Sequence, residues 1–199
     1  KFLDHIAEAG FARETVDAVV CTHLHVEHVG WNTMLIDGKW LPTFPKARYL
    51  IGKTEYDHWV KETEGETAAI MADSVSPIFD AGLAHIVEMD HRLSPAIHLV
   101  PTPGHTPGHV SVMIESKGET AIITGDMMHH PCQIGRPDWL NEFDGDKSAG
   151  AARRITMIRE WADKPYLIIG TPFAAPTAGH IVSDGQGHRF DAQAGTFGI

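Results

Sequence analysis

The segment "THLHVEHVG", residues 22–30, is the part of this sequence that decides its fold. It places three imidazoles and one carboxylate within six residues, at His23, His25, Glu27 and His28. Side chains two positions apart in an extended segment lie on the same face, so His23 and His25 can point in one direction. Glu27 and His28 follow as the chain turns. This single segment can therefore supply ligands to two adjacent metal ions.

The donor atoms of this segment are those that zinc prefers. Imidazole nitrogen binds Zn²⁺ at about 2.0–2.1 Å and carboxylate oxygen at about 2.0–2.2 Å. A carboxylate can bridge two cations, and a pair of ions about 3.5–4 Å apart can hold and activate a hydroxide. The chain has 14 histidines in total, however, so the cluster needs support from other parts of the sequence.

That support comes from residues that follow predicted strands. Four apolar runs have the composition of buried strands, and three of them lead into a residue that can bind a metal ion. Catalytic residues of layered α/β folds commonly lie on loops at strand ends, so we expect these side chains to converge. The runs are residues 18–22, 97–102, 120–125 and 166–171, followed by His23, His105, Asp126 and Pro172.

The remaining elements predict one α/β domain over residues 1–199, a layered sandwich with strands in the middle and helices flanking them. Thr54 and Asp57 have the spacing of a capping box, Asp146 is expected to cap a long helix, and Pro77 to end a shorter one. Further strands are expected at residues 47–52, 85–90 and 109–116 and in a hairpin over 180–190, and helices at 1–11, 54–65, 67–79 and 147–164.

The segments "THLHVEH", "TPGHTPGH", "ITGD" and "IIGT" resemble, in this order, the ligand motifs of the metallo-β-lactamase superfamily. The resemblance covers roughly residues 16–180 and implies an αββα sandwich. The flanks "HVGWNT", "GRPDWLNEFDGDKSAGAARR" and "FAAPTAGHIV" look most like the branch of arylesterases, lactonases and methyl-parathion-type hydrolases.

The resemblance also implies a set of metal ligands. His23, His25 and His105 would hold the first metal, and Asp126 would bridge the first metal and a second one. The expected cofactor is Zn²⁺, as one or two ions, with Mn²⁺, Co²⁺ or Fe²⁺ as alternatives.

The second metal site departs from the superfamily pattern at two positions. Glu27 stands beside His28 where the superfamily has Asp, and it is one methylene longer. Pro172 stands where the superfamily has its last His, and proline offers no donor atom. A misplacement of about 1 Å can cost an active site about a hundredfold in rate. We therefore expect a filled first site and a weak or empty second one.

Other histidines and the tryptophans are candidates for smaller roles. A spare histidine at 129, 130 or 180 could replace the lost ligand, although we expect His129, His130 and His180 at the surface or behind the ligands. His109 is expected to begin a strand. Trp31 follows the ligand segment and is the best candidate for a substrate pocket, whereas Trp40, Trp139 and Trp161 are expected in the core.

Few residues precede the first ligand motif. Only about 22 residues come before His23, whereas the superfamily usually has several strands there. We therefore expect a fold truncated at its N-terminus, because that region is absent from this chain or because another chain supplies the missing surface. An uncovered apolar sheet face favours association, so a homo-oligomer is predicted.

Charge and composition exclude several classes of partner. The net charge is −10 and no basic run occurs, which disfavours nucleic acid and anionic membranes. No apolar run approaches the roughly 18 residues of a membrane span. Cys21 and Cys132 form no disulfide framework and fit a reducing compartment, so a cytoplasmic location is expected.

These observations predict a metal-dependent hydrolase of a small molecule. Metal-bound water has a pKa near about 7 and would attack an ester, a lactone or an organophosphate. Glu27 and Asp126 are the expected catalytic residues, with Glu27 orienting the nucleophile or relaying its proton. No G-x-S-x-G motif competes with this interpretation. The alternative is a catalytically impaired or inactive protein of the same fold that binds at most one metal, because Glu27 and Pro172 weaken the site.

Overall fold

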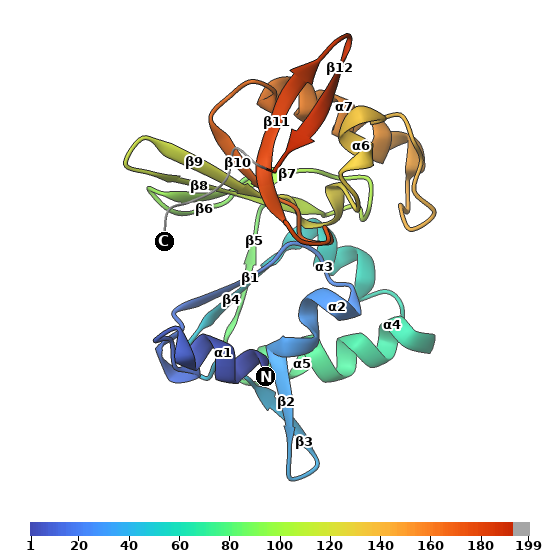
Figure 1. Ribbon diagram of the computed structural model, residues 1–199. Coiled ribbons are helices and arrows are strands. Elements are labelled where there is room, and N and C mark those ends of the chain that lie inside the picture. The colour runs from blue at the N-terminus through green and yellow to red at the C-terminus, as the bar shows by residue number, and fades with distance from the viewer. Residues whose placement is uncertain (193–199) are drawn as a thin grey trace. The chain divides into compact units, whose positions relative to one another are not determined.

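The computed structural model describes residues 1–192. The chain divides into two compact units, Lys1–Glu88 and a second unit that begins at Met89, coloured blue to green and green to red in Figure 1. The expectation of one domain over the whole chain stays a prediction. No helix in the described part is long and apolar enough to cross a membrane.

A parallel three-stranded sheet is the centre of the first unit, in the order β1-β4-β5. Tyr49 and Ile51 of the middle strand are fully buried. Ile51 packs in a cluster with Val29 and Val75, and Tyr49 packs in another with Ile78. The three strands lie where the sequence predicts them. They are β1 (Ala18–Cys21), β4 (Arg48–Gly52) and β5 (Ala84–Val87).

Short helices and a hairpin complete the first unit. Leu3 and Ile6 of the N-terminal helix pack against the cluster around Tyr49, which explains the amphipathic pattern of that segment. The hairpin consists of β2 (Thr33–Ile36) and β3 (Lys39–Pro42). The helical segments are α1 (Phe2–Glu8), α2 (Val26–Val29), α3 (Lys53–Trp59), α4 (Gly65–Ile70), the π-helical η3 (Met71–Val75) and α5 (Ser76–Asp80).

Two predicted helix boundaries in this unit are wrong. Thr54 and Asp57 form no capping box, because α3 begins directly after Gly52 and Asp57 instead pairs with Lys53 one turn earlier. The chain also stays helical beyond Pro77. Proline sits there in the first turn of α5, where its missing N–H removes no helical hydrogen bond.

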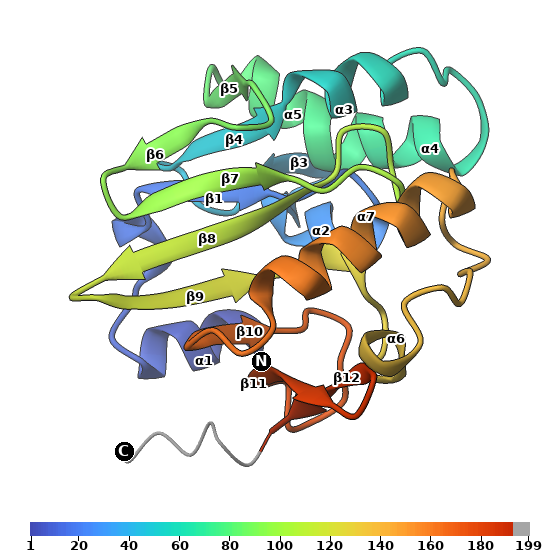
Figure 2. The same cartoon turned by 90° about the horizontal axis from the view of Figure 1, so that it is seen from above.

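A seven-stranded sheet forms the second unit, in the order β12-β11-β10-β9-β8-β7-β6 (Figure 2). Neighbouring strands are antiparallel except β9 and β10, which run parallel and are joined through α7 (Lys147–Trp161). The strands are β6 (Arg92–Ser94), β7 (Ile97–Pro101), β8 (Val110–Ser116), β9 (Glu119–Ile123), β10 (Tyr166–Ile169), β11 (Ala178–Asp184) and β12 (Gly187–Asp191).

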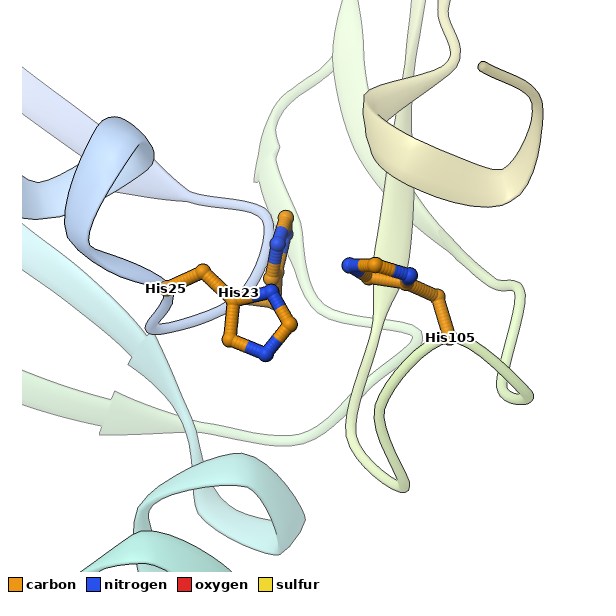
Figure 3. A group of neighbouring side chains, drawn as sticks. All are labelled: His23, His25 and His105. Carbon is orange, nitrogen blue, oxygen red and sulfur yellow. The ribbon is translucent and has the colours of Figure 1, made fainter. Parts of the chain in front are cut away.

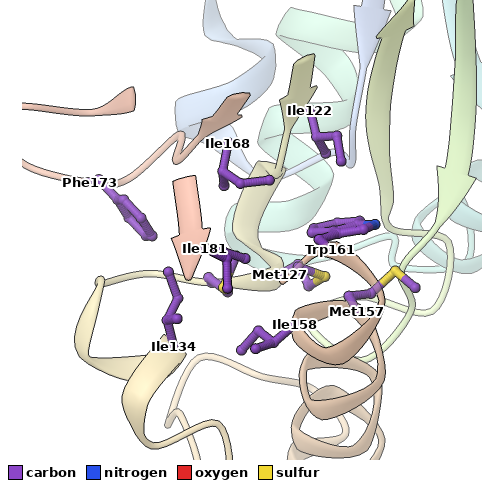
Figure 4. Close-up of a cluster of buried hydrophobic side chains, with 10 residues drawn as sticks. Ile122, Met127, Ile134, Met157, Ile158, Trp161, Ile168, Phe173 and Ile181 are labelled. Carbon is purple, nitrogen blue, oxygen red and sulfur yellow. The ribbon is translucent and has the colours of Figure 1, made fainter. Parts of the chain in front are cut away.

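The core of the second unit lies between α7 and this sheet. Met157, Ile158 and Trp161 on α7 cluster with Ile122 of β9 and Ile168 of β10 (Figure 4). Fully burying each such side chain contributes about 1.5–3 kcal/mol, so this packing fixes the helix on the sheet. The helix also begins as predicted, since the Asp146 carboxylate accepts a hydrogen bond from the Ala149 N–H at 2.9 Å.

Two of the tryptophans that were expected in the core are exposed. Trp161 is buried in the core as expected. Trp40 and Trp139 are 41% and 50% exposed, so their expected core positions are wrong. Trp40 lies opposite the exposed Leu35 in the β2–β3 hairpin, and the Arg136 guanidinium lies 5.1 Å from the centroid of the Trp139 ring. Trp31 is also exposed, and its ring lies 5.1 Å from that of Phe2.

Candidate metal centre

The first unit brings three of the predicted ligands together directly after β1. The ring centroid of His23 lies 4.7 Å from that of His25 and 4.1 Å from that of His28. His23 is fully buried. His25 has extended backbone angles and ends the loop, and His28 follows in α2. Figure 3 shows the His23 and His25 side chains on this loop.

Glu27 lies apart from this group of imidazoles. It occupies the first turn of α2, and its side chain is exposed. Among the described residues its carboxylate joins no set of three donor atoms within 4.8 Å of one another. Its predicted role as a ligand therefore stays a prediction.

A buried carboxylate from another helix holds the ligand loop. Glu55 of α3 accepts hydrogen bonds from the Leu24 backbone N–H at 3.1 Å and from the Trp59 indole N–H at 2.6 Å. The Trp59 ring in turn packs edge-on against the His25 ring, with 5.5 Å between centroids. Glu55 and Trp59 thus position the segment between His23 and His25. The sequence gives no signal for this role, because the contact spans 31 residues.

In the second unit, His105 lies on the loop between β7 and β8, shown in Figure 3. Gly104 before it has φ +140, and a Cβ there would collide with the backbone of Gly150 on α7. Hydrogen bonds tie the same loop to the start of α7: Gly145 N–H donates to the His105 carbonyl at 3.0 Å and Asp146 N–H to the Gly104 carbonyl at 2.9 Å. Direct backbone packing therefore fixes the position of His105.

The His105 ring has its own carboxylate partner. Asp144 Oδ1 lies 3.3 Å from His105 Nδ1, and both side chains are almost fully buried. Asp144 is in turn 3.7 Å from the buried Arg154 guanidinium, which donates to the carbonyls of Met127 and Trp139. Burial lowers the pKa of Arg154, and the Asp144 charge opposes that shift. A carboxylate that accepts from Nδ1–H orients the ring so that Nε2 can bind a metal, as in many histidine sites.

Asp126 is positioned by a histidine that the sequence analysis assigned only to the start of a strand. Asp126 lies in the short turn η4 (Gly125–Met127) with non-helical angles, φ −95 and ψ 19. Its backbone N–H donates to His109 Nε2 at 2.9 Å. His109 Nδ1 lies 2.8 Å from the Thr102 hydroxyl and is fully buried. The second His of "TPGHTPGH" was the available signal, and it marks a residue that holds Asp126.

His129 adds a third donor beside His105 and Asp126. Their ligand atoms all lie within 4.8 Å of one another. Asp126 Oδ2 is 3.6 Å from His105 Nε2 and 3.5 Å from His129 Nε2. His129 was named as a possible replacement ligand and was expected at the surface or behind the ligands, and its side chain is 21% exposed. His130 is exposed and His180 lies in β11.

Pro172 occupies an exposed turn after β10. Beside it Thr171 N–H donates to the Thr124 hydroxyl at 3.4 Å, while the Phe173 ring enters the hydrophobic core. The turn is thus anchored on both sides of a residue that has no donor atom.

The donor chemistry of the second unit fits a divalent metal ion. Two imidazole nitrogens and one carboxylate oxygen are a common zinc ligand set, and imidazole also suits iron, copper and nickel. His129 Nε2 is buried and has no hydrogen-bond partner among the described residues. A buried nitrogen of this kind is stabilised by a bound cation.

Sequence comparison assigns the family. The model of the family described as "Metallo-beta-lactamase superfamily" matches residues 1–163. The chain belongs to this superfamily. The predicted membership of this superfamily is confirmed, and the chain has the metallo-β-lactamase fold.

Three relatives illustrate how this superfamily member compares with known proteins. An N-acyl homoserine lactonase from Bacillus sp is 22% identical over 85% of this chain and 61% of its own length. The crystal structure of AbOPH, a hydrolase in the beta lactamase superfamily, has a TM-score of 0.83 and 24% identity, over 94% of this chain and 68% of that chain. The dizinc quorum-quenching lactonase AidC, in complex with a product, has a TM-score of 0.80 and 22% identity, over 95% and 68%.

These metallo-beta-lactamase relatives agree with the predicted lactonase-like branch, since their names describe hydrolases and lactonases. The chain spans about three fifths of the length of the curated lactonases that it matches. Likeness to the solved structures establishes the fold.

Proposed function

We propose that this protein is a metal-dependent hydrolase of a small ester or lactone. The observation that carries the proposal is the group His105, Asp126 and His129, whose donor atoms lie within 4.8 Å of one another behind the ends of strands. Membership of the superfamily and the names of the relatives support the same reaction class. An arylester and an organophosphate triester are the alternative substrates.

We further propose that the predicted ligands bind the metal, and that the metal is Zn²⁺, as one or two ions. Mn²⁺, Co²⁺ and Fe²⁺ have the same kind of donors available. When bound, such an ion acts as a Lewis acid and lowers the pKa of water to about 7. The proposed ligands are His23, His25, Glu27, His28, His105 and Asp126.

The residues around the ligands orient them. Asp144 accepts from His105 Nδ1–H and keeps that proton away from Nε2, the nitrogen that faces Asp126. His109 holds the backbone of Asp126, and Glu55 holds the loop of His23 and His25. We assign to Glu27, which is exposed, the relay of a proton between the reacting water and bulk solvent.

Charge and surface composition support a small substrate and self-association. A net charge of −10 repels polyanions such as nucleic acid. The hairpin of β2 and β3 exposes apolar side chains, and such patches favour association. We therefore propose a homo-oligomer that uses this hairpin. The exposed side chains are Leu35, Ile36, Trp40 and Leu41.

A rate assay tests the proposed reaction. Initial rates on N-hexanoyl homoserine lactone, dihydrocoumarin, p-nitrophenyl acetate and paraoxon are compared for the protein with Zn²⁺ or Mn²⁺ and for the free metal. We expect hydrolysis well above the free metal on a lactone or ester, lost in His105→Ala and kept in His85→Ala, which changes an exposed histidine.

The second candidate function is a metal-binding protein with little or no turnover. The exposed Glu27 and the donor-free Pro172 favour it, because both reduce the ligand set of a second metal. Rates no faster than the free metal on every substrate, with metal stably bound, would establish this alternative and contradict the proposed hydrolase.

A further inference from the structure

We propose that His129 is a metal ligand. With His105 and Asp126 it forms a three-donor site contained entirely in the second unit. The inference deepens the proposed function and rests on its metal dependence alone, whatever the substrate.

The distances between the donor atoms are those of ligands to one ion. Asp126 Oδ2 is 3.6 Å from His105 Nε2 and 3.5 Å from His129 Nε2. Both separations exceed the 2.7–3.2 Å of ordinary N–H···O hydrogen bonds. Two ligands about 2.0–2.1 Å from a tetrahedral ion are about 3.3–3.4 Å apart. Small side-chain shifts would therefore bring all three atoms onto one cation.

The burial of His129 also points to a ligand. Its side chain is 21% exposed, but the Nε2 atom is buried and lacks a hydrogen-bond partner among the residues that the structure describes. A polar nitrogen buried in this way is unfavourable unless another group satisfies it. A cation held jointly with Asp126 and His105 satisfies it.

The backbone around His129 is fixed, so the ring is already in place. His129 follows Asp126 by three residues, and its N–H donates to the buried Gln133 Oε1 at 2.7 Å. The His130 N–H contacts the same oxygen at 3.4 Å. One short anchored segment thus carries two donors, much as the loop of His23 and His25 does in the first unit.

Asn141 controls which nitrogen of His129 can bind metal. The side-chain nitrogen of Asn141 is placed 2.5 Å from His129 Nδ1, and its oxygen accepts from Phe143 N–H at 3.0 Å. Binding through Nε2 requires the proton on Nδ1, and that proton needs an acceptor. An Asn141 amide turned over supplies one, since the nitrogen and oxygen of an amide are nearly interchangeable in shape, at the cost of the hydrogen bond from Phe143 N–H.

Zinc titration of the full chain tests the proposal. The metal-stripped protein is titrated with Zn²⁺ by calorimetry, and bound zinc is counted after dialysis. We expect His129→Ala to lose one zinc equivalent or to weaken its binding by at least about a hundredfold, more than the usual effect of residues behind the ligands. The exposed neighbour His130→Ala should stay within about twofold of the parent chain.

A second variant keeps the test decisive if His129→Ala folds poorly in thermal melts. Asn141→Asp offers oxygens to both His129 and Phe143, and we expect it to tighten Zn²⁺ binding several-fold. Unchanged zinc affinity in both His129→Ala and Asn141→Asp would overturn the proposal, even if hydrolysis falls. If the parent chain hydrolyses none of the substrates but His129→Ala loses zinc, the His129 proposal is sustained and the proposed function fails.

Discussion

In the first unit, His23, His25 and His28 lie on one short segment, whereas the second unit draws its donors from separate loops, with His105 on one and Asp126 and His129 on another. The first arrangement follows from local spacing along the chain. The second requires the strands β7, β8 and β9 to pair in register before the donors meet. The same kind of chemistry is thus encoded locally in one unit and through tertiary packing in the other.

The carboxylates that support the two donor groups also act differently. Glu55 binds a backbone N–H beside His23, so it fixes the loop. Asp144 binds the Nδ1 atom of the His105 ring, so it fixes the ligand and its tautomer. The difference teaches that Asp144 acts directly on the ring of a donor, while Glu55 acts on the backbone that carries its donors.

The largest expected effect is a difference in kcat/KM between variants that remove a donor from each unit. His105→Ala should lower kcat/KM on the best substrate by at least about a thousandfold, equivalent to about 4 kcal/mol of lost metal stabilisation. His28→Ala should cost far less, because we assign it to the weaker metal site. Equal losses in the two variants, measured with zinc content in parallel, would show that both sites are needed.

A smaller effect is expected from the two supporting carboxylates. Asp144→Asn should weaken Zn²⁺ binding about 10–100-fold, because it removes the negative charge beside His105 Nδ1 and the partner of the buried Arg154. Glu55→Gln keeps an oxygen for the Leu24 N–H and should change the affinity by less than about threefold. Calorimetric titration of both variants measures the difference, and a reversed order would refute the contrast between them.

Restoring the superfamily ligand should produce a gain. Pro172→His adds an imidazole at the turn after β10, and we expect it to tighten the weaker zinc ion by roughly tenfold, about 1.4 kcal/mol. Pro172→Ala, which relaxes the backbone without adding a donor, is the matched control. No difference between His and Ala at this position would mean that the turn does not reach the metal.

The smallest effect concerns the stability of the first unit at alkaline pH. Burial raises the pKa of Tyr49 from 10.0 to about 12, although a hydrogen bond with Phe44 opposes the shift. The unfolded chain therefore loses the phenol proton first, and stability falls as pH rises from about 10 to 12, by roughly 3 kcal/mol at most. Tyr49→Phe has no such proton. Chemical denaturation across this range should show a shallower loss for Tyr49→Phe than for the parent chain.

Sequence periodicity and strand-end positions predicted most of the strands and the candidate metal-binding residues that follow them. The position of β1 directly before His23 was predictable because a short apolar run next to a polar cluster is visible in the local sequence. The segment "KGE" between the predicted strands 109–116 and 120–125 has the composition of a hairpin turn, and Lys117 and Gly118 both have the positive φ, 52 and 84, that a two-residue hairpin requires. Asp146 capped its helix for the same local reason.

The supporting residues were not predictable because their partners are distant in the chain. Glu55 meets Leu24 across 31 residues and Asp144 meets His105 across 39, and no pattern within either segment announces the contact. His129 was expected at the surface or behind the ligands, since nothing in the local sequence shows that its ring turns toward Asp126. Such roles arise only when loops from different strands pack together.

The close approach of Gly104 and Gly150 has a practical consequence for anyone redesigning this protein. The loop that carries His105 rests on α7 with no side chain between them, and a Cβ on Gly150 would press against the Asp144 carboxylate. Combinatorial libraries that randomise these two positions would consist largely of variants with a displaced helix. Diversity is better introduced at the β8–β9 turn, where Glu115, Ser116 and Glu119 are exposed.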